Sequence, residues 1–284
     1  DLFSCDLAVD HAFLVQDLDG VAILQNPPSM HQIDAGLAEV RGVDAGETRD
    51  LDVLGLNESW PVEAGVDGPA ITFGCLELVG EVQQPDGYLN TWYTVKAPGE
   101  RWTNLAECHE LYTAGHMIEA AVAYFQATGK RALLDVVCRL ADHIDRVFGP
   151  GVDQLQGYDG HPEIELALMR LYEVTGETRY RDLVNYFVEQ RGAQPHFYDS
   201  EFGKRGGTWH WPNHGTAWMV KDKAYSQAHA PLSEQDTAIG HAVRFVYLMT
   251  GVAHLARLAG DERKRQDCLR LWQNMARRQT RQMR

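Results

Sequence analysis

Residues 104–147, NLAECHELYTAGHMIEAAVAYFQATGKRALLDVVCRLADHIDRV, predict a helical hairpin and so decide the fold class. Apolar side chains recur at roughly helical spacing in the first half, which predicts a helix over Asn104–Thr128. Gly129 supplies the left-handed position that ends a helix. A second helix is expected over Ala132–Val147, ending before Gly149-Pro150-Gly151.

The hairpin pattern recurs twice further along the chain. Three predicted helices end in the same signature, an aromatic residue, two further residues and Thr-Gly, at Phe125–Gly129, Tyr172–Gly176 and Tyr247–Gly251. The first two glycines are 47 residues apart, a spacing that suits one helical hairpin per repeat. The further helices are expected at Pro162–Thr175, Tyr180–Glu189, Ser233–Thr250, Val252–Ala259 and Glu262–Arg278.

Hairpins in series form either an open solenoid or a closed toroid whose inner helix ends line a cavity. The spacing predicts an all-α fold without deciding between the two. A long loop at about Gln194–His229 interrupts the series and is rich in Trp, His and Gly. Such loops are often functional, but a packed cover over the helix ends is an equal alternative. The residues that enrich it are Trp209, His210, Trp211, His214 and Trp218.

The first 82 residues differ from the rest. They hold 16 Asp and Glu against Arg41 and Arg49, so this segment carries the whole formal net charge of −14. Frequent glycines and the lack of a helical period predict an irregular acidic segment, with short strands possible at Val21–Leu24 and Ile71–Leu78. We therefore expect two modules, residues 1–82 of unknown fold and residues 83–284 forming the helical domain.

Composition excludes several classes of function. The acidic charge argues against a nucleic-acid partner. No apolar run is long enough for a membrane span, and the first ten residues do not form a signal peptide. The five cysteines are scattered without a CxxC pair, which predicts reduced thiols and a cytoplasmic location rather than disulfides or a sequence-local zinc site.

Histidines give the best candidates for a site. His109 and His116 are seven residues apart, so they share one face of the first predicted helix. His161 opens the helix Pro162–Thr175, with Glu165 expected beside it one turn later. His241 is expected inside the helix Ser233–Thr250. Imidazoles can donate or accept hydrogen bonds to sugar hydroxyls, although a histidine on an apolar helix is more often a core residue.

Other motifs are weaker. The turn at Pro85-Asp86-Gly87 is followed by Tyr88, Trp92 and Tyr93, which would either stack on a sugar face or pack as an ordinary buried loop. The pair His109-Glu110 lacks the second histidine of a zinc-protease motif, since position 113 is Thr. Glu163 and Glu165 are two residues apart on a helix and do not look like an acid and nucleophile pair.

Several segments together resemble the glycoside hydrolase family 127 of β-L-arabinofuranosidases, formerly a domain of unknown function. The resemblance covers about residues 83–283. It rests on Gln83–Thr91 (QQPDGYLNT), Arg101–Leu105 (RWTNL), His109–Tyr112 (HELY), Ala114–His116 (AGH), Gly160–Leu168 (GHPEIELAL), Ser226–Pro231 (SQAHAP) and Gly240–Arg244 (GHAVR).

The resemblance implies an (α/α)6 toroid and a retaining exo-glycosidase with a zinc-bound cysteine thiolate as nucleophile and a glutamate as general acid. It also implies that His109, His161 and His241 contact sugar hydroxyls. None of the five cysteines sits in a matching motif, so the sequence offers neither zinc ligands nor catalytic residues of the family type. We therefore expect an incomplete toroid with the zinc and cysteine half outside this chain.

Two functions remain open, and whether the chain is itself an enzyme is left undecided. The first is hydrolysis of β-L-arabinofuranosides. The second is a non-catalytic carbohydrate-binding or assembly module of the same fold; another toroid enzyme, a lyase or epimerase, is weaker. The expected partner is a small saccharide, bound by the four histidines with Glu165 and Asp86. An open half-toroid also predicts self-association through exposed apolar helix faces.

Overall fold

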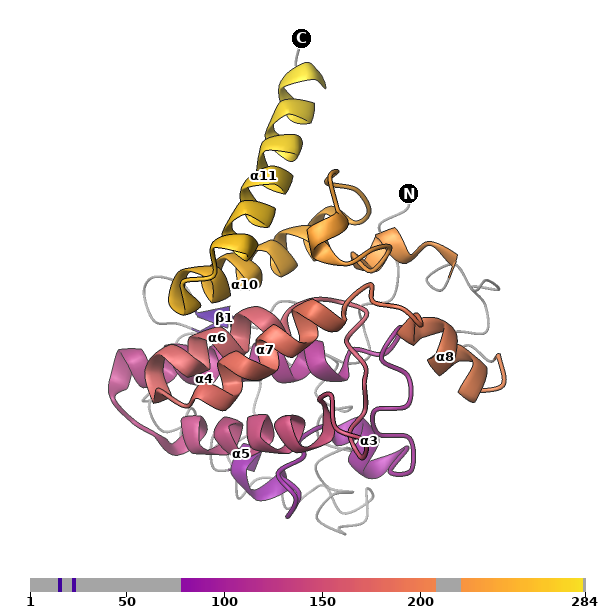
Figure 1. The fold of residues 1–284 in the computed structure, drawn as a ribbon. Coiled ribbons are helices and arrows are strands. Elements are labelled where there is room, and N and C mark those ends of the chain that lie inside the picture. The colour runs from indigo at the N-terminus through magenta and orange to yellow at the C-terminus, as the bar shows by residue number, and fades with distance from the viewer. Residues whose placement is uncertain (1–14, 17–21, 24–77, 208–220, 283–284) are drawn as a thin grey trace.

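The computed structural model describes residues 15–16, 22–23, 78–207 and 221–282 (Figure 1). Most of the acidic segment lies outside the described residues, and so do residues 71–77 of the strand predicted at Ile71–Leu78. So do Trp209, His210, Trp211, His214 and Trp218. Within the predicted strand at Val21–Leu24, β2 (Ala22–Ile23) pairs antiparallel with β1 (Val15–Gln16), and Val15 lies opposite Ile23.

Residues 78–207 and 221–282 are helical apart from their connections, which confirms the predicted all-α class. None of the described helices combines the length and the apolar character that a membrane crossing requires. The helices are α3 (Thr91–Val95), α4 (Glu110–Thr128), α5 (Ala132–Val147), α6 (Ile164–Thr175), α7 (Thr178–Gln190), α8 (Phe197–Lys204), α10 (Ala242–Ala259) and α11 (Glu262–Gln282), with 3-10 turns η3 (Lys223–Ser226) and η4 (Leu232–Glu234).

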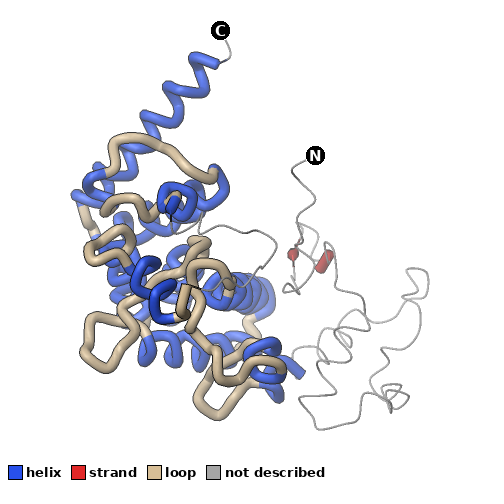
Figure 2. Tube along the Cα trace, turned by 90° about the vertical axis from the view of Figure 1, so that its right-hand side faces the viewer, coloured by secondary structure: helices blue, strands red, loops and turns tan. Residues whose placement is uncertain are grey.

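Three hairpins, α4–α5, α6–α7 and α10–α11, pack side by side in two layers. The first helix of each hairpin contacts the next, so α4, α6 and α10 form one row, and α5, α7 and α11 pack behind them. In Figure 1 the turns that close the hairpins lie at one end, and the connections leading into α4, α6 and α10 gather at the other. Figure 2, viewed from that end, shows these loops over the helix ends.

The predicted stops at Gly129 and Gly176 are confirmed, with φ of 71° and 75° in the left-handed region. The predicted stop at Gly251 is wrong, because α10 runs through it and ends at Gly260. A Cβ at position 251 would lie 2.8 Å from the Glu165 Cβ. The glycine there permits close packing of α10 on α6 rather than a turn.

Two predicted helix starts are also wrong. The helix predicted from Asn104 begins at Glu110, because the Asn104 side chain bonds the backbone and carboxylate of Glu107 in a turn. The Glu201 carboxylate accepts the amides of Leu105 and Ala106 in that turn. The helix predicted from Ser233 begins at Ala242, so His241 is its N-cap and accepts a hydrogen bond from the Arg244 amide.

The predicted loop Gln194–His229 includes helical turns in its described parts. It contains α8 and η3. Its α8 carries Glu201, which binds the turn before α4, so part of the loop covers the helix ends as the packing alternative proposed.

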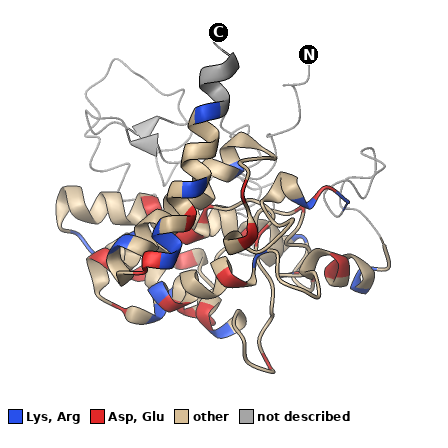
Figure 3. Cartoon of the chain, turned by 45° about the horizontal axis from the view of Figure 1, so that its top comes forward, with Lys and Arg blue, Asp and Glu red and all other residues tan. Residues whose placement is uncertain are grey.

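Ion pairs join neighbouring helices across the surface of the helical rows. Arg170 on α6 pairs with Glu119 on α4, Arg257 on α10 with Glu173 on α6, and Arg179 on α7 with Asp142 on α5. Figure 3 shows both signs of charge interspersed over these helices. Pairs of this exposed kind each contribute little, on the order of 0–1 kcal/mol, so the apolar core between the rows provides most of the cohesion.

The buried guanidinium of Arg191 joins three segments of the chain. Arg191 follows α7 and is only 2% exposed. It donates to the carbonyls of Asp159 (2.9 Å) and Ser226 (3.0 Å) and to the Glu165 carboxylate (3.0 Å). Asp159 precedes α6, Glu165 lies in the first turn of α6, and Ser226 lies in η3. One side chain therefore holds the entry to the middle hairpin.

We expect Arg191→Met to destabilise the protein by about 3–5 kcal/mol, because it leaves the Glu165 charge buried and uncompensated. Urea unfolding followed by circular dichroism measures the change. Arg131→Met is the matched control, since Arg131 and Asp135 form an exposed pair expected to be worth no more than about 1 kcal/mol. Equal losses in the two variants would contradict the role given to Arg191.

We expect Gly251→Ala to destabilise by about 1–3 kcal/mol, because the added methyl group overpacks the contact with Glu165. This outcome opposes the helix propensity of alanine, which alone would stabilise by about 1 kcal/mol. Gly203→Ala in α8 is the control, since a Cβ there meets nothing within 4 Å. A stabilised Gly251→Ala variant in thermal unfolding would show that the contact tolerates a side chain.

Candidate functional site

A cluster of imidazole and phenol rings forms where α4, α6 and α10 begin. His161 lies at its centre, with ring centroids 4.4 Å from Tyr112, 5.9 Å from His109, 6.4 Å from His241 and 5.6 Å from Tyr247. All these side chains are half-buried. We call this set the ring cluster: His109, Tyr112, His116, His161, Tyr225, His241 and Tyr247.

Gly160 places His161 in the cluster. Its amide donates to the Leu105 carbonyl at 2.9 Å, and a Cβ would lie 2.1 Å from the Ala106 carbonyl oxygen. The turn before α4 and the turn before α6 are therefore in direct contact. Only glycine fits there, which brings His161 next to His109.

The His161 ring is neutral near pH 7. Burial, followed by the nearby Arg244 charge, lowers its pKa to about 3. Its Nδ1 lies 3.0 Å from the Pro162 carbonyl oxygen, so Nδ1 carries the proton and donates. Nε2 is then the acceptor nitrogen, suited to a hydroxyl group.

Arg244 links His241 to the rest of the cluster. The side chain is buried and donates to the Gly160 carbonyl (3.0 Å) and the Ser226 hydroxyl (2.8 Å). Its guanidinium lies 4.2 Å from the centre of the Tyr225 ring. Burial and the Arg244 charge lower the pKa of His241, which keeps this imidazole neutral as well.

Two predicted site residues lie outside the ring cluster. Glu165, expected beside His161, is 1% exposed and bonds Arg191 instead. Asp86 is half-exposed, and its carboxylate lies 3.4 Å from Arg101 and 3.7 Å from His143. The structure thus brings His109, His116, His161 and His241 together, and it assigns Glu165 and Asp86 to other contacts.

The aromatic residues after Asp86 serve packing. Tyr88 and Tyr93 are buried, and the Tyr88 hydroxyl donates to Glu110. Glu110 also accepts the Trp102 amide at 2.8 Å, and burial raises the pKa of its carboxyl to about 7. Tyr88 and Tyr93 therefore pack in a buried loop, which is the second of the two alternatives that the sequence left open.

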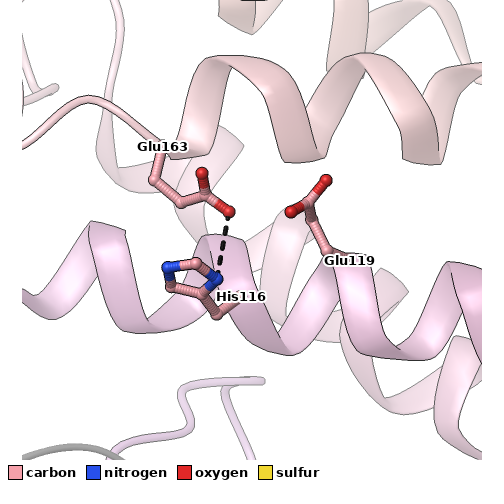
Figure 4. A group of neighbouring side chains, drawn as sticks. All are labelled: His116, Glu119 and Glu163. Carbon is pink, nitrogen blue, oxygen red and sulfur yellow. Dashed lines mark ion pairs between the residues drawn. The ribbon is translucent and has the colours of Figure 1, made fainter. Parts of the chain in front are cut away.

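His116 extends the cluster toward two carboxylates (Figure 4). Its Nδ1 lies 3.4 Å from Glu163 Oε1, and Glu119 is one turn further along α4. One ligand atom from each of the three residues lies within 4.8 Å of the others. Glu163 is fully buried, and burial followed by the Glu119 charge raises its pKa to about 10.

This group does not match the zinc set that the family resemblance implies. It contains no cysteine. Burial raises the pKa of the thiols of Cys138 and Cys268, the latter to about 11, so both are protonated near neutral pH. The described residues therefore present one His/Glu/Glu group, and they present no cysteine set of the kind that the resemblance implies.

Sequence reasoning missed several residues of the site. The sequence pattern places Tyr112 on the apolar face of the first predicted helix and Tyr247 in a stop signature, and it predicts no role for Glu163. Arg244 follows His241 by three residues in the segment GHAVR, and Glu163 follows His161 by two in the segment GHPEIELAL. This closeness in sequence to the predicted histidines is the pattern that points to both residues.

A separate hollow of about 530 Å³ lies on the same helical row. Arg170, Glu173 and His254 line it, and the residues of the ring cluster do not. It is open and is lined by side chains engaged in ion pairs. The converging rings, rather than this hollow, make the candidate site.

Comparison with known proteins identifies relatives of the same kind. A family model described as "Beta-L-arabinofuranosidase, GH127 catalytic domain" matches residues 72–281. The match begins about ten residues before the boundary expected at 82. A non-reducing end β-L-arabinofuranosidase of Bifidobacterium longum subsp. longum is 44% identical over 204 residues, which are 70% of this chain and 30% of that protein.

Solved structures agree. A GH127 β-L-arabinofuranosidase from Geobacillus stearothermophilus T6 superposes with a TM-score of 0.68 at 46% identity, covering 86% of this chain and 34% of that one. The GH127 β-arabinofuranosidase BT3674 gives 0.60 at 33% identity, covering 86% and 33%. The chain therefore spans about a third of the length of these relatives, and it belongs to the GH127 family of β-L-arabinofuranosidases.

Proposed function

We propose that this chain binds the sugar of β-L-arabinofuranosides as part of a retaining glycoside hydrolase with the (α/α)6-toroid fold. The observation that carries the proposal is the convergence of His109, His161 and His241 at the starts of the three inner helices. His116 lies beside them through Tyr112. Three separate helices thus present hydrogen-bonding rings to one place, and the rings of His161 and His241 are neutral because their pKa values are lowered.

The chemistry of the ring cluster suits a neutral saccharide. Neutral imidazoles each offer one donor and one acceptor, and burial raises the pKa of Tyr112 and Tyr247, so their hydroxyl groups stay protonated. Fixed polar groups of this kind set the orientation of a sugar, while ring faces contact its C–H surface. Glu165 and Asp86 act in this proposal by positioning Arg191 and His143.

A second function, carbohydrate binding without catalysis, is favoured by the protonated thiols of Cys138 and Cys268. A thiolate nucleophile needs a lowered pKa. Release of nitrophenol from 4-nitrophenyl β-L-arabinofuranoside separates the two functions. With zinc and a thiol reductant present, we expect no turnover by the 284-residue chain, and measurable turnover would reject the binding-only function.

Four further expectations belong to this proposal. They are the module boundary near residue 82, a cytoplasmic location, a requirement for the family zinc during catalysis and the absence of a nucleic-acid partner.

We expect His161→Ala to weaken binding of methyl β-L-arabinofuranoside about tenfold or more, because one hydrogen bond to a buried ring is worth about 1.4 kcal/mol. Isothermal titration calorimetry of the whole chain measures the affinity. His254→Ala is the control, since His254 pairs with Glu173 in the separate hollow. Unchanged affinity in a folded His161→Ala variant would reject the ring cluster as the sugar site.

We also propose that the chain self-associates through α10 and α11. Each helix exposes an apolar pair three residues apart, Val243 with Val246 and Leu269 with Trp272, of which Trp272 is 59% exposed. Exposed apolar surface of this kind is typical of contact sites.

We expect the unaltered chain to show a mass above the monomer in multi-angle light scattering, and Trp272→Lys to shift it toward the monomer. Gln273→Lys adds the same charge at an adjacent exposed position, so it serves as the control and should leave the mass unchanged. A monomeric unaltered chain would contradict the proposal.

A further inference from the structure

We propose that His116, Glu119 and Glu163 form a binding site for a divalent transition-metal ion, best satisfied by Zn²⁺. The proposal stands on geometry and does not depend on the proposed sugar-binding function. It concerns an imidazole and two carboxylates, a donor set different from the cysteine-rich one that the resemblance implies.

The spacing of the three residues suits chelation. His116 and Glu119 are three residues apart on α4, so they project from one face of the helix, as metal-binding His and Glu pairs do in helical bundles. Glu163 approaches from the N-cap of α6. A tetrahedral zinc ion with bonds of about 2.0–2.1 Å places its ligands roughly 3.3 Å apart. His116 Nδ1 and Glu163 Oε1 are already 3.4 Å apart.

The third ligand needs only a small movement. This ligand is Glu119, and one of its carboxylate oxygens lies within 4.8 Å of the ligand atoms of His116 and Glu163. Figure 4 shows the carboxylates of Glu119 and Glu163 directed toward one another, with the His116 ring beside Glu163. A rotation of the Glu119 side chain, which is partly exposed and pairs with Arg170, closes the remaining distance.

Glu163 is buried between α4 and α6. Its side chain is 0% exposed, and its polar neighbours among the described residues include the His116 ring, 3.4 Å from Oε1, and the Glu119 carboxylate. Gly115 makes room for it, because a Cβ at that position would lie 2.6 Å from the Glu163 Cγ. A buried carboxylate is costly unless a cation or a full set of hydrogen bonds compensates its charge, and a second carboxylate beside it adds to that cost. A bound cation would remove that cost for Glu163 and for the neighbouring Glu119.

The donor types narrow the choice of ion. One imidazole and two carboxylates suit zinc and other first-row divalent ions, whereas magnesium and calcium prefer oxygen ligands alone. Three protein ligands leave one tetrahedral position for water or a sugar hydroxyl. Because His116 also contacts Tyr112 and Tyr247, that position would border the ring cluster.

Zinc titration of the chelator-treated whole chain, with a chromogenic chelator as competitor, tests the proposal. We expect one Zn²⁺ per chain to bind saturably and to raise the melting temperature. Glu163→Gln keeps the shape over Gly115 and removes the charge, so we expect affinity at least about tenfold weaker and no thermal shift. Glu119→Gln, at a partly exposed position, is a second variant with the same expected loss.

Glu173→Gln is the matched control, because Glu173 forms a His/Glu pair with His254 outside this group. Its zinc affinity should equal that of the unaltered chain. The proposal is overturned if no saturable equivalent binds, as a proton shared between the two carboxyl groups would predict. It is also overturned if folded Glu163→Gln and Glu119→Gln bind zinc as tightly as Glu173→Gln, since the ion would then occupy other histidines or cysteines.

Discussion

The guanidinium of Arg191 is the interaction on which the rest of the described structure depends. It is buried, and it bonds the Glu165 carboxylate and the carbonyls of Asp159 and Ser226. Asp159 and Glu165 lie on either side of His161 in the sequence, and Ser226 lies in η3, which precedes His241. Burying an ion pair costs desolvation free energy, and the attraction between the two charges offsets this cost only when the remaining hydrogen-bond donors are also satisfied. The carbonyls of Asp159 and Ser226 accept hydrogen bonds from Arg191 and so help to offset the cost.

Close contact between helices is the second constraint. Glu163 packs across Gly115 of α4, and Glu165 packs across Gly251 of α10. Two residues at the start of α6 therefore point in different directions and seat the middle helix against both neighbours. The starts of the three helices converge as a result, and the ring cluster is the consequence of that convergence. The packing of the core and the geometry of the site share the same contacts.

In the proposed function, recognition of a sugar is separate from cleavage of its bond. The imidazole and phenol groups of the ring cluster would bind hydroxyl groups, while bond cleavage in a retaining enzyme needs a nucleophile and a proton donor of matched pKa. The described thiols of Cys138 and Cys268 have raised pKa values and lie outside the cluster. The chain spans about a third of the length of its GH127 relatives, and we propose that this third serves recognition.

The sequence by itself determined the helical hairpins, the stops at Gly129 and Gly176, the four histidines and the family, because helix periodicity, capping and motifs are properties of neighbouring residues. Only the tertiary structure decided what Gly251, Glu165 and Glu163 do. Gly251 has the local signature of a stop, yet it lies inside α10 because Glu165 occupies the space of its missing side chain. Glu163 joins His116 across 47 residues of chain, a proximity that arises from the packing of α6 on α4 and that no local pattern encodes.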